Sequence, residues 1–282
     1  MSFVPDLAAY QARIGLPGPL PPTLATLRAL TDAHVRTIPF ENLDVLLGRG
    51  IDLEPAVIEQ KLVHDRRGGY CFEQNTLLLH VLAALGFEVT PLSARVRVQR
   101  PRDYTPARTH LFVRVDLDGE GWLADVGVGA LSPTAPLRLD TEDEQPTPHE
   151  PRRIVRAGRW HDDSLRGPEA LLYHQVRFAD GWHDICEFTL EEMPEIDRVV
   201  ASWYTSAHPG SHFKNRLIVA RANDLGRLTL LNRELQQRDR AGHATIRALG
   251  GPDELLDVLA TEFGLQFPAG TRFPCPALAD WT

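Results

Sequence analysis

Residues 66–75 read RRGGYCFEQN, and this stretch leads into a predicted helix that begins at Cys71. From Cys71 onward, the run CFEQNTLLLHVLAALGF repeats apolar residues at helical spacing as far as Leu85, and Gly86 is a typical stop. If the helix begins at Cys71, the thiol lies where unpaired backbone N–H groups and the positive end of the helix dipole converge. Such a position favours the thiolate, which is the nucleophilic form of cysteine.

Two interpretations of Cys71 remain open at this point. The preceding glycines, Gly68 and Gly69, let the chain turn sharply and keep bulk away from the sulfur, which suits a nucleophile. Burial as an inert core residue is the commoner fate of a free cysteine. Cys186 lies inside a predicted strand and Cys275 between two prolines, so both are weaker candidates for catalysis. The wide spacing of the three cysteines predicts neither a disulfide framework nor a metal site.

The composition argues against several classes of protein. A chain of 282 residues suits one to three small domains, and 43% hydrophobic with 24% charged residues is ordinary for a globular protein. The net charge of −8 argues against nucleic-acid binding, which needs a basic surface. No apolar stretch approaches the roughly 20 residues of a membrane helix, and the N-terminus lacks the pattern of a secretion signal. We therefore expect a cytoplasmic protein that does not bind membranes.

The order of the predicted elements indicates an α+β protein. Residues 1–88 read as helices, with a stop at Gly15 and an N-cap at Thr23, and should form a bundle. Residues 89–205 carry short runs of β-branched and aromatic residues between turn formers, which is typical of strands. Residues 206–282 mix further strands with one capped helix.

The same pattern predicts three local features. The runs at 159–165 and 212–223 should be strands, because both contain aromatic or β-branched residues. The stretch at 139–153 is polar and contains several prolines, so it should be an exposed loop.

A predicted hairpin brings a candidate base and an acid together. The Asp-Gly pair at 118–119 is a strong signal for a two-residue turn, which sets His110 opposite Gly127. Asp125 then lies on the same sheet face as His110, diagonally across the ladder at about 7–8 Å between backbones. An imidazole and a carboxylate close that gap with a hydrogen bond. A four-residue turn would move the pair two residues further apart.

These residues suit a nucleophile, a base and an orienting acid. Asp125 is flanked by apolar residues, where a carboxylate is costly unless it is paired. The alternative is a solvated sheet face on which His110 and Asp125 are incidental neighbours. Cysteine, histidine and aspartate form one known version of the acyl-transfer triad, which is recognised by roles rather than by order. On this interpretation Cys71 is the nucleophile.

Four motifs now carry a resemblance: HVRTIPFENLDVLLGR, RRGGYCFEQN, RTHLFVRV and WLADVGVG. Together they resemble the arylamine N-acetyltransferase family over residues 10–130, and WYTSAHPGSHF at 203–213 is similar to the start of the family's last domain. The resemblance implies a helical bundle at 1–88, a β-barrel at 89–205 and an α/β lid at 206–282, around a cysteine-protease-like core.

The resemblance also implies an enzyme of xenobiotic metabolism with a ping-pong reaction. Acetyl-CoA would be the co-substrate, with no permanently bound cofactor and no metal. Cys71 would take the acetyl group and pass it to an arylamine or arylhydrazine, while His110 moves protons and Asp125 orients its ring. Glu41 and Arg67 would form a buried ion pair that braces the nucleophile loop, because a guanidinium suits a bidentate carboxylate. The alternative for that pair is a weak surface contact.

Substrate contacts are expected after the acid and at nearby aromatic residues. The pantetheine arm of CoA would pass close to the backbone of one segment, which consists of Gly127, Val128, Gly129 and Ala130. This segment departs from the family's usual pattern, which has an aromatic at the position of Val128 and a glycine at that of Ala130. Candidates for the pocket that holds a flat amine are Phe40, Tyr70, Val128 and Phe213. For each aromatic residue, plain core packing is the alternative.

Three alternative functions remain beside the acetyltransferase. An amide synthase of the same fold would act on a polyketide thioester, and the altered glycine segment leaves room for that substrate. A papain-like or transglutaminase-like hydrolase would use the same three residues with water as the acceptor and would not need CoA. A non-enzymatic binding module would make the triad a coincidence, which the fitting positions of the three residues argue against.

Overall fold

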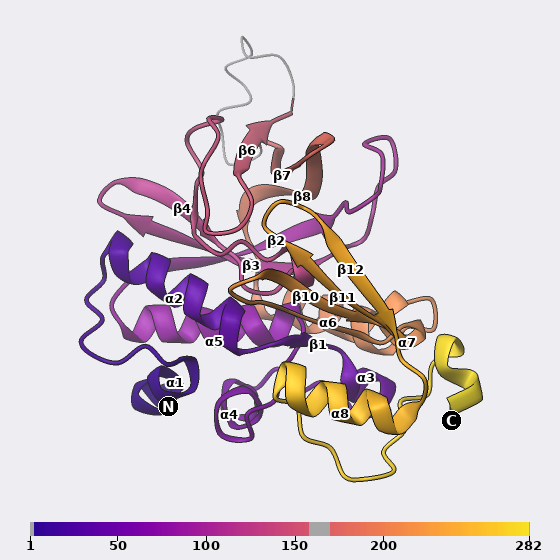
Figure 1. The fold of residues 1–282 in the computed structure, drawn as a ribbon. Helices are drawn as coiled ribbons and strands as arrows, with labels where there is room; N and C mark the ends of the chain where they lie inside the picture. The colour runs from indigo at the N-terminus through magenta and orange to yellow at the C-terminus, as the bar shows by residue number, and fades with distance from the viewer. Residues whose placement is uncertain (1–2, 158–169, 282) are drawn as a thin grey trace.

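Helix α5, Cys71–Ala84, is the central element of the first third of the chain (Figure 1). The structure is a computed structural model that describes residues 3–157 and 170–281. Leu78 and Leu82 of α5 are completely buried against the neighbouring helices and one face of the central sheet, as their helical spacing predicts.

The other helices of this bundle include one as long as α5 and several short ones. They are α1 (Leu7–Ile14), α2 (Leu24–Thr37), α3 (Leu43–Leu46), α4 (Pro55–Glu59) and a π-helix, η1 (Gln60–His64), that continues α4. Helix α1 ends at Gly15, which has a φ of 70°, and the Thr23 side chain caps α2 by accepting from the N–H of Thr26. Both predicted boundaries are therefore confirmed. Among the described residues, no helix combines the length and the apolar character needed to cross a bilayer.

A seven-stranded sheet follows the bundle and curls into a nearly closed barrel (Figure 1). Its strands are β2 (Glu88–Val96), β3 (Arg108–Leu117), β4 (Glu120–Ala124), β5 (Leu137–Arg138), β6 (Arg152–Arg156), β7 (Leu172–Phe178) and β8 (Gly181–Glu192). The order is β5-β4-β3-β2-β8-β7-β6, and the two end strands contact each other. Phe112 and Phe188 pack edge to face in the barrel core. The predicted β-barrel is confirmed.

The β3–β4 hairpin has the predicted two-residue turn but not the full predicted ladder. Leu117 pairs with Glu120, and the pairing continues only as far as Val113 opposite Ala124. The expectation that His110 lies opposite Gly127 is wrong, because β4 ends at Ala124 and the chain then turns beneath α5.

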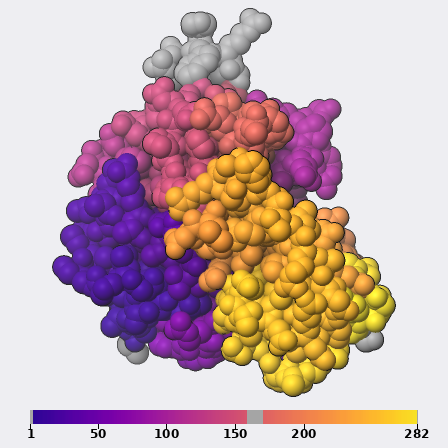
Figure 2. Space-filling model, in the orientation of Figure 1, coloured from indigo at the N-terminus to yellow at the C-terminus, as the bar shows by residue number. Residues whose placement is uncertain are grey.

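The last third of the chain forms a second sheet with helices beside it. Its strands, in spatial order, are β1 (Phe40–Glu41), β9 (Ile218–Ala222), β10 (Gly226–Leu231), β11 (Glu234–Asp239) and β12 (Ala244–Ala248). The remaining helices are α6 (Glu195–Ala207), α7 (His212–Asn215), α8 (Pro252–Phe263) and two 3-10 helices, η2 (Gly129–Leu131) and η4 (Pro276–Trp281). Figure 2 shows this orange and yellow region packed against both the indigo helices and the magenta barrel. The predicted lid is confirmed.

Two sequence predictions in this region are wrong. Residues 89–205 are predicted to consist of strands, but the end of this range forms helix α6, because tertiary packing of Ala201 and Thr205 favours the helical form. The strand predicted at 212–223 begins only at Ile218, because Ser211 caps a short helix before it. The strand predicted at 159–165 lies outside the described residues. We keep the three-part division as a proposal, with α6 as the link across the boundary near residue 205.

The stretch at 139–153 is not simply an exposed loop, because its last residues are buried between the barrel and the second sheet. The carboxylate of Glu150 accepts from Arg227 at 2.7 Å, from Arg238 at 2.9 Å and from Arg152 at 3.2 Å. Burial opposes ionisation, but these three guanidinium groups hold the pKa of Glu150 well below its usual range. The charged residues of this stretch therefore join two sheets, which hydropathy alone did not indicate.

Candidate active site

Cys71 lies at the first position of α5, as the sequence predicts. Its residue is only 4% exposed, and the sulfur lies 3.6 Å from the carbonyl oxygen of Thr109 on β3. The preceding residue, Tyr70, is the N-cap, and its backbone N–H donates to the carboxylate of Glu73 at 3.0 Å. The helix start is thereby fixed directly beside the thiol.

The glycines before Cys71 serve close packing rather than a sharp turn. The left-handed conformation falls on Arg66, with a φ of 54°, and not on Gly68 or Gly69. A Cβ on Gly68 would lie 2.1 Å from the Pro39 carbonyl oxygen, and one on Gly69 would lie 2.8 Å from the Glu73 side chain. The expectation that these glycines turn the chain and clear space for the sulfur is therefore wrong, since they make room for neighbouring backbone and the capping carboxylate.

His110 and Asp125 form a buried pair next to Cys71. The Nε2 atom of His110 lies 2.8 Å from a carboxylate oxygen of Asp125, and the residues are 1% and 0% exposed. The alternative of a solvated sheet face is therefore wrong. Because Nε2 is engaged by Asp125, Nδ1 is the ring nitrogen left to interact with Cys71.

The electrostatics of this pair favour the charged form of both groups. Burial alone would lower the pKa of a histidine, but the Asp125 carboxylate, with help from Cys71, raises the pKa of His110 to about 10. Burial also opposes ionisation of Asp125, yet His110 and hydrogen bonds from Gly127 and Asn75 hold the pKa of Asp125 below its usual value. The site therefore holds an imidazolium at neutral pH, and such a group favours a thiolate beside it.

Asn75 is a part of the site that the sequence interpretation missed. Its amide donates to Asp125 at 3.0 Å and to the carbonyl oxygen of Leu111 at 2.6 Å, while its own oxygen accepts from the N–H of Val126 at 3.0 Å. Asn75 follows Cys71 by four residues, which places both side chains on the same face of α5. The spacing of four residues between Cys71 and Asn75 is the signal in the sequence that could have identified Asn75. Helix α5 therefore carries the thiol and also holds the loop that contains Asp125.

Gly127 is expected to tolerate no side chain, because it packs directly against helix α5. This reason is independent of the approach of CoA along the segment after Asp125. A Cβ there would lie 2.7 Å from the Cα of Cys71 and 2.6 Å from the Asn75 amide nitrogen. We expect Gly127→Ala to destabilise the protein by about 1–3 kcal/mol and to lower kcat/KM, because the backbone of α5 must move. Urea unfolding and steady-state kinetics measure the two effects.

Gly50→Ala is the matched control, since a Cβ at Gly50 meets no atom within 4 Å. Equal stability and kinetics for the Gly127→Ala and Gly50→Ala proteins would contradict this account of Gly127.

Glu41 and Arg67 form the ion pair that was expected, although its geometry differs. Arg67 donates through Nη2 at 2.6 Å and Nε at 3.1 Å, and both bonds go to the same Glu41 oxygen. The second Glu41 oxygen accepts from the N–H of Leu43 at 2.7 Å, so the pair is not bidentate at the carboxylate. Glu41 is 1% exposed, which makes the alternative of a surface contact wrong. The pair extends through Asp44, which Arg67 contacts at 3.2 Å.

Lys61 completes a charged cluster beneath the nucleophile helix, and the sequence interpretation missed it. Its ammonium group lies 2.7 Å from both Asp44 and Glu73. Lys61 belongs to η1, where the π-helical turn changes the direction of side chains relative to a regular α-helix. Although burial opposes the charge, the surrounding carboxylates raise the pKa of Lys61. Lys61 thereby links the Glu41–Arg67 pair to the Glu73 that caps α5.

The predicted aromatic residues gather around Cys71, whereas Val128 packs elsewhere. Phe213 lies 6.0 Å from Phe40 and 5.9 Å from Tyr70 between ring centroids, within the apolar cluster that contains Cys71. Tyr70 is completely buried and its hydroxyl bonds to Ser202, so core packing accounts for it. Phe213 is half-buried at the edge of this cluster.

The segment after Asp125 divides between two apolar clusters. Val128 packs against the barrel core, and Ala130 packs against the cluster around Cys71. Gly129 has a φ of 68° and lies beside the ring of Phe40, so its conformation and its space both favour glycine.

The other two cysteines lie in hydrophobic cores, and neither is at the start of an α-helix. Cys186 is on β8 inside the barrel, where burial raises the pKa of its thiol well above the usual value. Cys275 is buried in the core between α8 and the second sheet. All three cysteines are unpaired, so each is available for comparison by substitution.

Comparison with known proteins agrees with the geometry of the site. The family model described as N-acetyltransferase matches residues 23–271. An arylamine N-acetyltransferase of Mycobacterium tuberculosis is 43% identical over 265 residues, which cover 93% of this chain and 89% of that protein. The solved structure of the Mycobacterium smegmatis enzyme matches with a TM-score of 0.85 and 41% identity, over 93% of this chain and 92% of that one.

A further solved structure carries a ligand. It is the Mycobacterium marinum arylamine N-acetyltransferase in complex with CoA, which matches with a TM-score of 0.84 and 39% identity over 92% of this chain and 93% of that one. The agreement of sequence and fold extends over almost the whole chain and confirms the resemblance seen in the motifs. The chain belongs to the arylamine N-acetyltransferase family.

Proposed function

We propose that this protein transfers the acetyl group of acetyl-CoA to an arylamine or arylhydrazine through a thioester on Cys71. The observation that carries the proposal is the buried contact of His110 with Asp125, next to a cysteine at the first position of α5. Membership of the arylamine N-acetyltransferase family supports the type of reaction and the acceptor class. The CoA complex of the Mycobacterium marinum relative supports acetyl-CoA as the donor.

In the first half-reaction the Cys71 thiolate attacks the carbonyl carbon of the acetyl thioester. The carbonyl oxygen becomes an oxyanion, which the backbone N–H of Cys71 at the free end of α5 stabilises. The bond between the acetyl carbon and the CoA sulfur then breaks, and the CoA thiolate takes a proton from the His110 imidazolium. An acetyl group now remains on Cys71, and His110 is neutral.

In the second half-reaction the amine nitrogen attacks the same carbonyl carbon. Neutral His110 takes the proton that the nitrogen loses, and the Cys71 thiolate leaves as the amide forms. Asp125 keeps the Nε2 atom of His110 occupied, so that Nδ1 faces the reacting groups in both steps. Asn75 holds the Asp125 carboxylate through this cycle and is a positioning residue.

Substrates would approach Cys71 along the apolar cluster and the segment after Asp125. Phe40 and Phe213 offer aromatic faces for a flat amine, while the buried Tyr70 packs against Phe213 as part of the core. Val128 packs against the barrel core instead, so it is not among the proposed acceptor contacts. The backbone from Gly127 to Ala130 is the stretch along which the pantetheine arm would run.

The acetyl-enzyme itself is the most direct test of this proposal. After incubation with acetyl-CoA alone, digestion at acid pH and mass spectrometry should find one added acetyl group on the Cys71 peptide. Peptides that contain Cys186 and Cys275 serve as internal controls and should be unmodified. Addition of an arylamine before the quench should remove the acetyl group and yield the N-acetyl product.

Two results would contradict the proposal. An unmodified Cys71 peptide would exclude the thioester intermediate. A thioester that water removes as fast as an arylamine does would instead favour the hydrolase.

A further inference from the structure

Helix α6 presents an apolar stripe to the outside of the protein. Its exposed members are Ile196, Val199, Val200, Trp203 and Tyr204, and the exposed fractions are 66% for Ile196 and 63% for Trp203. These positions follow helical spacing, so the five side chains lie on one face. The opposite face is buried on β3 through Ala201, Ser202 and Thr205. Helix α6 thus packs a face of small residues on the sheet and leaves its apolar face exposed.

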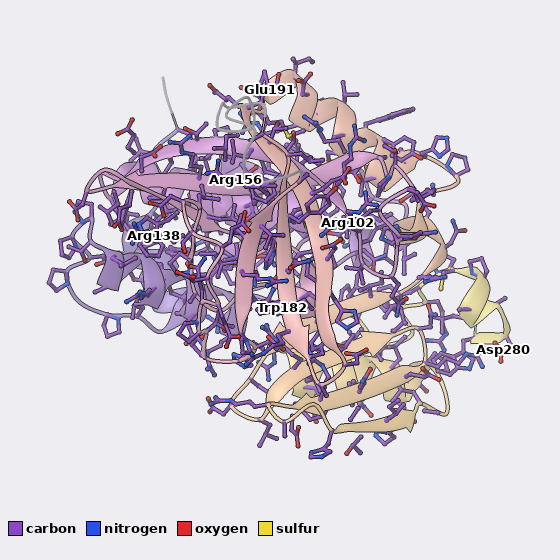
Figure 3. All side chains as sticks on the ribbon, turned by 90° about the horizontal axis from the view of Figure 1, so that it is seen from above. Arg102, Arg138, Arg156, Trp182, Glu191 and Asp280 are labelled. Carbon is purple, nitrogen blue, oxygen red and sulfur yellow. The ribbon has the colours of Figure 1, made fainter. Side chains whose placement is uncertain are left out.

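The α6 stripe is large for an apolar patch on the surface of a monomer. The exposed fractions of its five residues correspond to an area on the order of 500 Å², near the upper end for the largest apolar patch of a monomer. Two such stripes together would cover about 1,000 Å², which is where specific protein interfaces begin. Figure 3 shows α6 along the outer edge of the molecule, beside the labelled Glu191, so the stripe is open to a second protein.

Charge is divided between the two ends of α6. The exposed residues near its N-terminal end are acidic, and they are Glu191, Glu192, Glu195 and Asp197. The exposed charged residues after its C-terminal end are the basic Lys214 and Arg216, with the exposed His208 nearby. A surface with one acidic and one basic end is complementary to its own copy when the two are antiparallel. The acidic end also opposes binding to anionic lipid, which is the other surface that an exposed tryptophan suits.

We propose that the α6 stripe is the interface of a symmetric dimer of this chain. A twofold axis between Val199 and Val200 places Trp203 on the partner's Ile196 and His208 beside the partner's Glu191. The same contacts repeat on the other side of the axis, as an isologous interface requires. The antiparallel arrangement also places the positive dipole end of each helix beside the negative end of the other.

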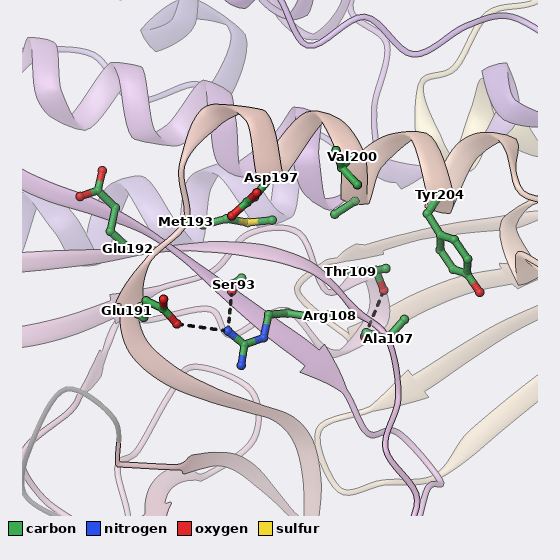
Figure 4. A pocket seen from close by; sticks show the side chains of 11 residues that line it. Ser93, Ala107, Arg108, Thr109, Glu191, Glu192, Met193, Asp197, Val200 and Tyr204 are labelled. Atoms are coloured by element: carbon green, nitrogen blue, oxygen red, sulfur yellow. Dashed lines mark hydrogen bonds and ion pairs between the residues drawn. The ribbon is translucent and has the colours of Figure 1, made fainter.

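A groove beside α6 gives this interface depth. It has a volume of about 440 Å³ and lies between α6 and the ends of β2, β3 and β8. Figure 4 shows Val200, Tyr204 and Asp197 along its helical side and Arg108 on its sheet side, where Arg108 contacts Ser93 and Glu191. The partner's apolar side chains can enter at Val200 and Tyr204, and the acidic rim faces the basic end of the partner helix.

The test is the mass of the intact chain in solution, measured by light scattering and sedimentation over a range of concentrations. Wild type should reach twice the chain mass of 31.5 kDa. Trp203→Glu and Val199→Glu should weaken the dimer by at least tenfold, because each buries a carboxylate against the partner's apolar face. Leu225→Glu is the matched control: Leu225 is 66% exposed, like the stripe, but lies in the turn after β9, and its variant should remain dimeric.

Each contrary result overturns the proposal. A wild-type chain that stays monomeric at high concentration excludes the dimer. A dimer that survives both substitutions on α6, or that dissociates equally in Leu225→Glu, places the interface elsewhere. Circular dichroism of the three variants confirms that they are folded. Binding of the monomer to vesicles of phosphatidylcholine and phosphatidylserine, lost in Trp203→Glu, would assign the stripe to a lipid surface instead.

Discussion

Cys71→Ser is expected to lower kcat for acetyl transfer by about 10⁴-fold or more, since removal of a nucleophile has effects of that size in other acyl-transfer enzymes. A serine hydroxyl keeps its proton at neutral pH, and the imidazolium of His110 is then no longer balanced by a thiolate. The rate of arylamine N-acetylation, monitored through the release of CoA, measures this loss of kcat. The structure of the variant should be unchanged, because the two side chains differ by one atom.

The other two cysteines provide the controls. Cys186→Ser and Cys275→Ser should keep acetyl transfer near the wild-type rate, although both sites are buried and a hydroxyl there costs stability. Kinetics should therefore be measured below the unfolding transition of each variant. An active Cys71→Ser protein, or loss of activity in a folded Cys186→Ser protein, would show that the nucleophile is wrongly assigned.

Asp125→Asn is expected to have the second-largest effect, a loss of about 10⁴-fold in kcat by analogy with the acid of other triads. Without the carboxylate, the largest interactions that raise the pKa of His110 are lost while its burial remains, so this pKa falls from about 10. The imidazolium is then less favourable, and the thiolate of Cys71 loses part of its counter-charge. The amide of asparagine can also hold the ring in the wrong tautomer.

Alkylation by iodoacetamide separates this electrostatic effect from a structural one. Wild type should react quickly at neutral pH, because a raised histidine pKa keeps the imidazolium present as the pH rises until it approaches about 10. Asp125→Asn should react slowly at neutral pH and recover its reactivity only in alkaline solution, where thiols ionise unaided. Acetyl-CoA should protect Cys71 from the reagent. If Cys71 in Asp125→Asn is alkylated as fast as in wild type, Asp125 does not stabilise the charged pair of His110 and Cys71.

Local features of the fold could be predicted from the sequence where a short-range signal specified them. The start of α5 at Cys71 and the two-residue turn after Leu117 each depend on a few adjacent residues, and both are confirmed. The position of Asp125 beside His110 is also as expected, although β4 ends before the ladder reaches either residue. The two-residue turn determines the register of β3 and β4. The hydrogen bonds of Asn75 then hold the loop that carries Asp125.

Features that depend on distant parts of the chain could not be predicted in this way. Glu150 lies in a stretch with every property of a loop, and only the arrival of Arg227 and Arg238 from another sheet makes its burial favourable. The helical form of α6 likewise depends on burial of Ala201 against β3, since its β-branched and aromatic residues favour strands. Lys61 needed the π-helical turn to reach Glu73.

The two-residue strand β1 has a consequence for the order of folding. Phe40 pairs with Ala220 of β9 on one side and with Gly69, just before Cys71, on the other. The backbone beside the nucleophile is therefore completed only when a strand from the last third of the chain has arrived, a contact of very high sequence separation. During synthesis the helical region emerges first and must wait for β9. Acetyl transfer should therefore appear with the final docking of the lid, so that a chain gains reactivity only once it is folded throughout.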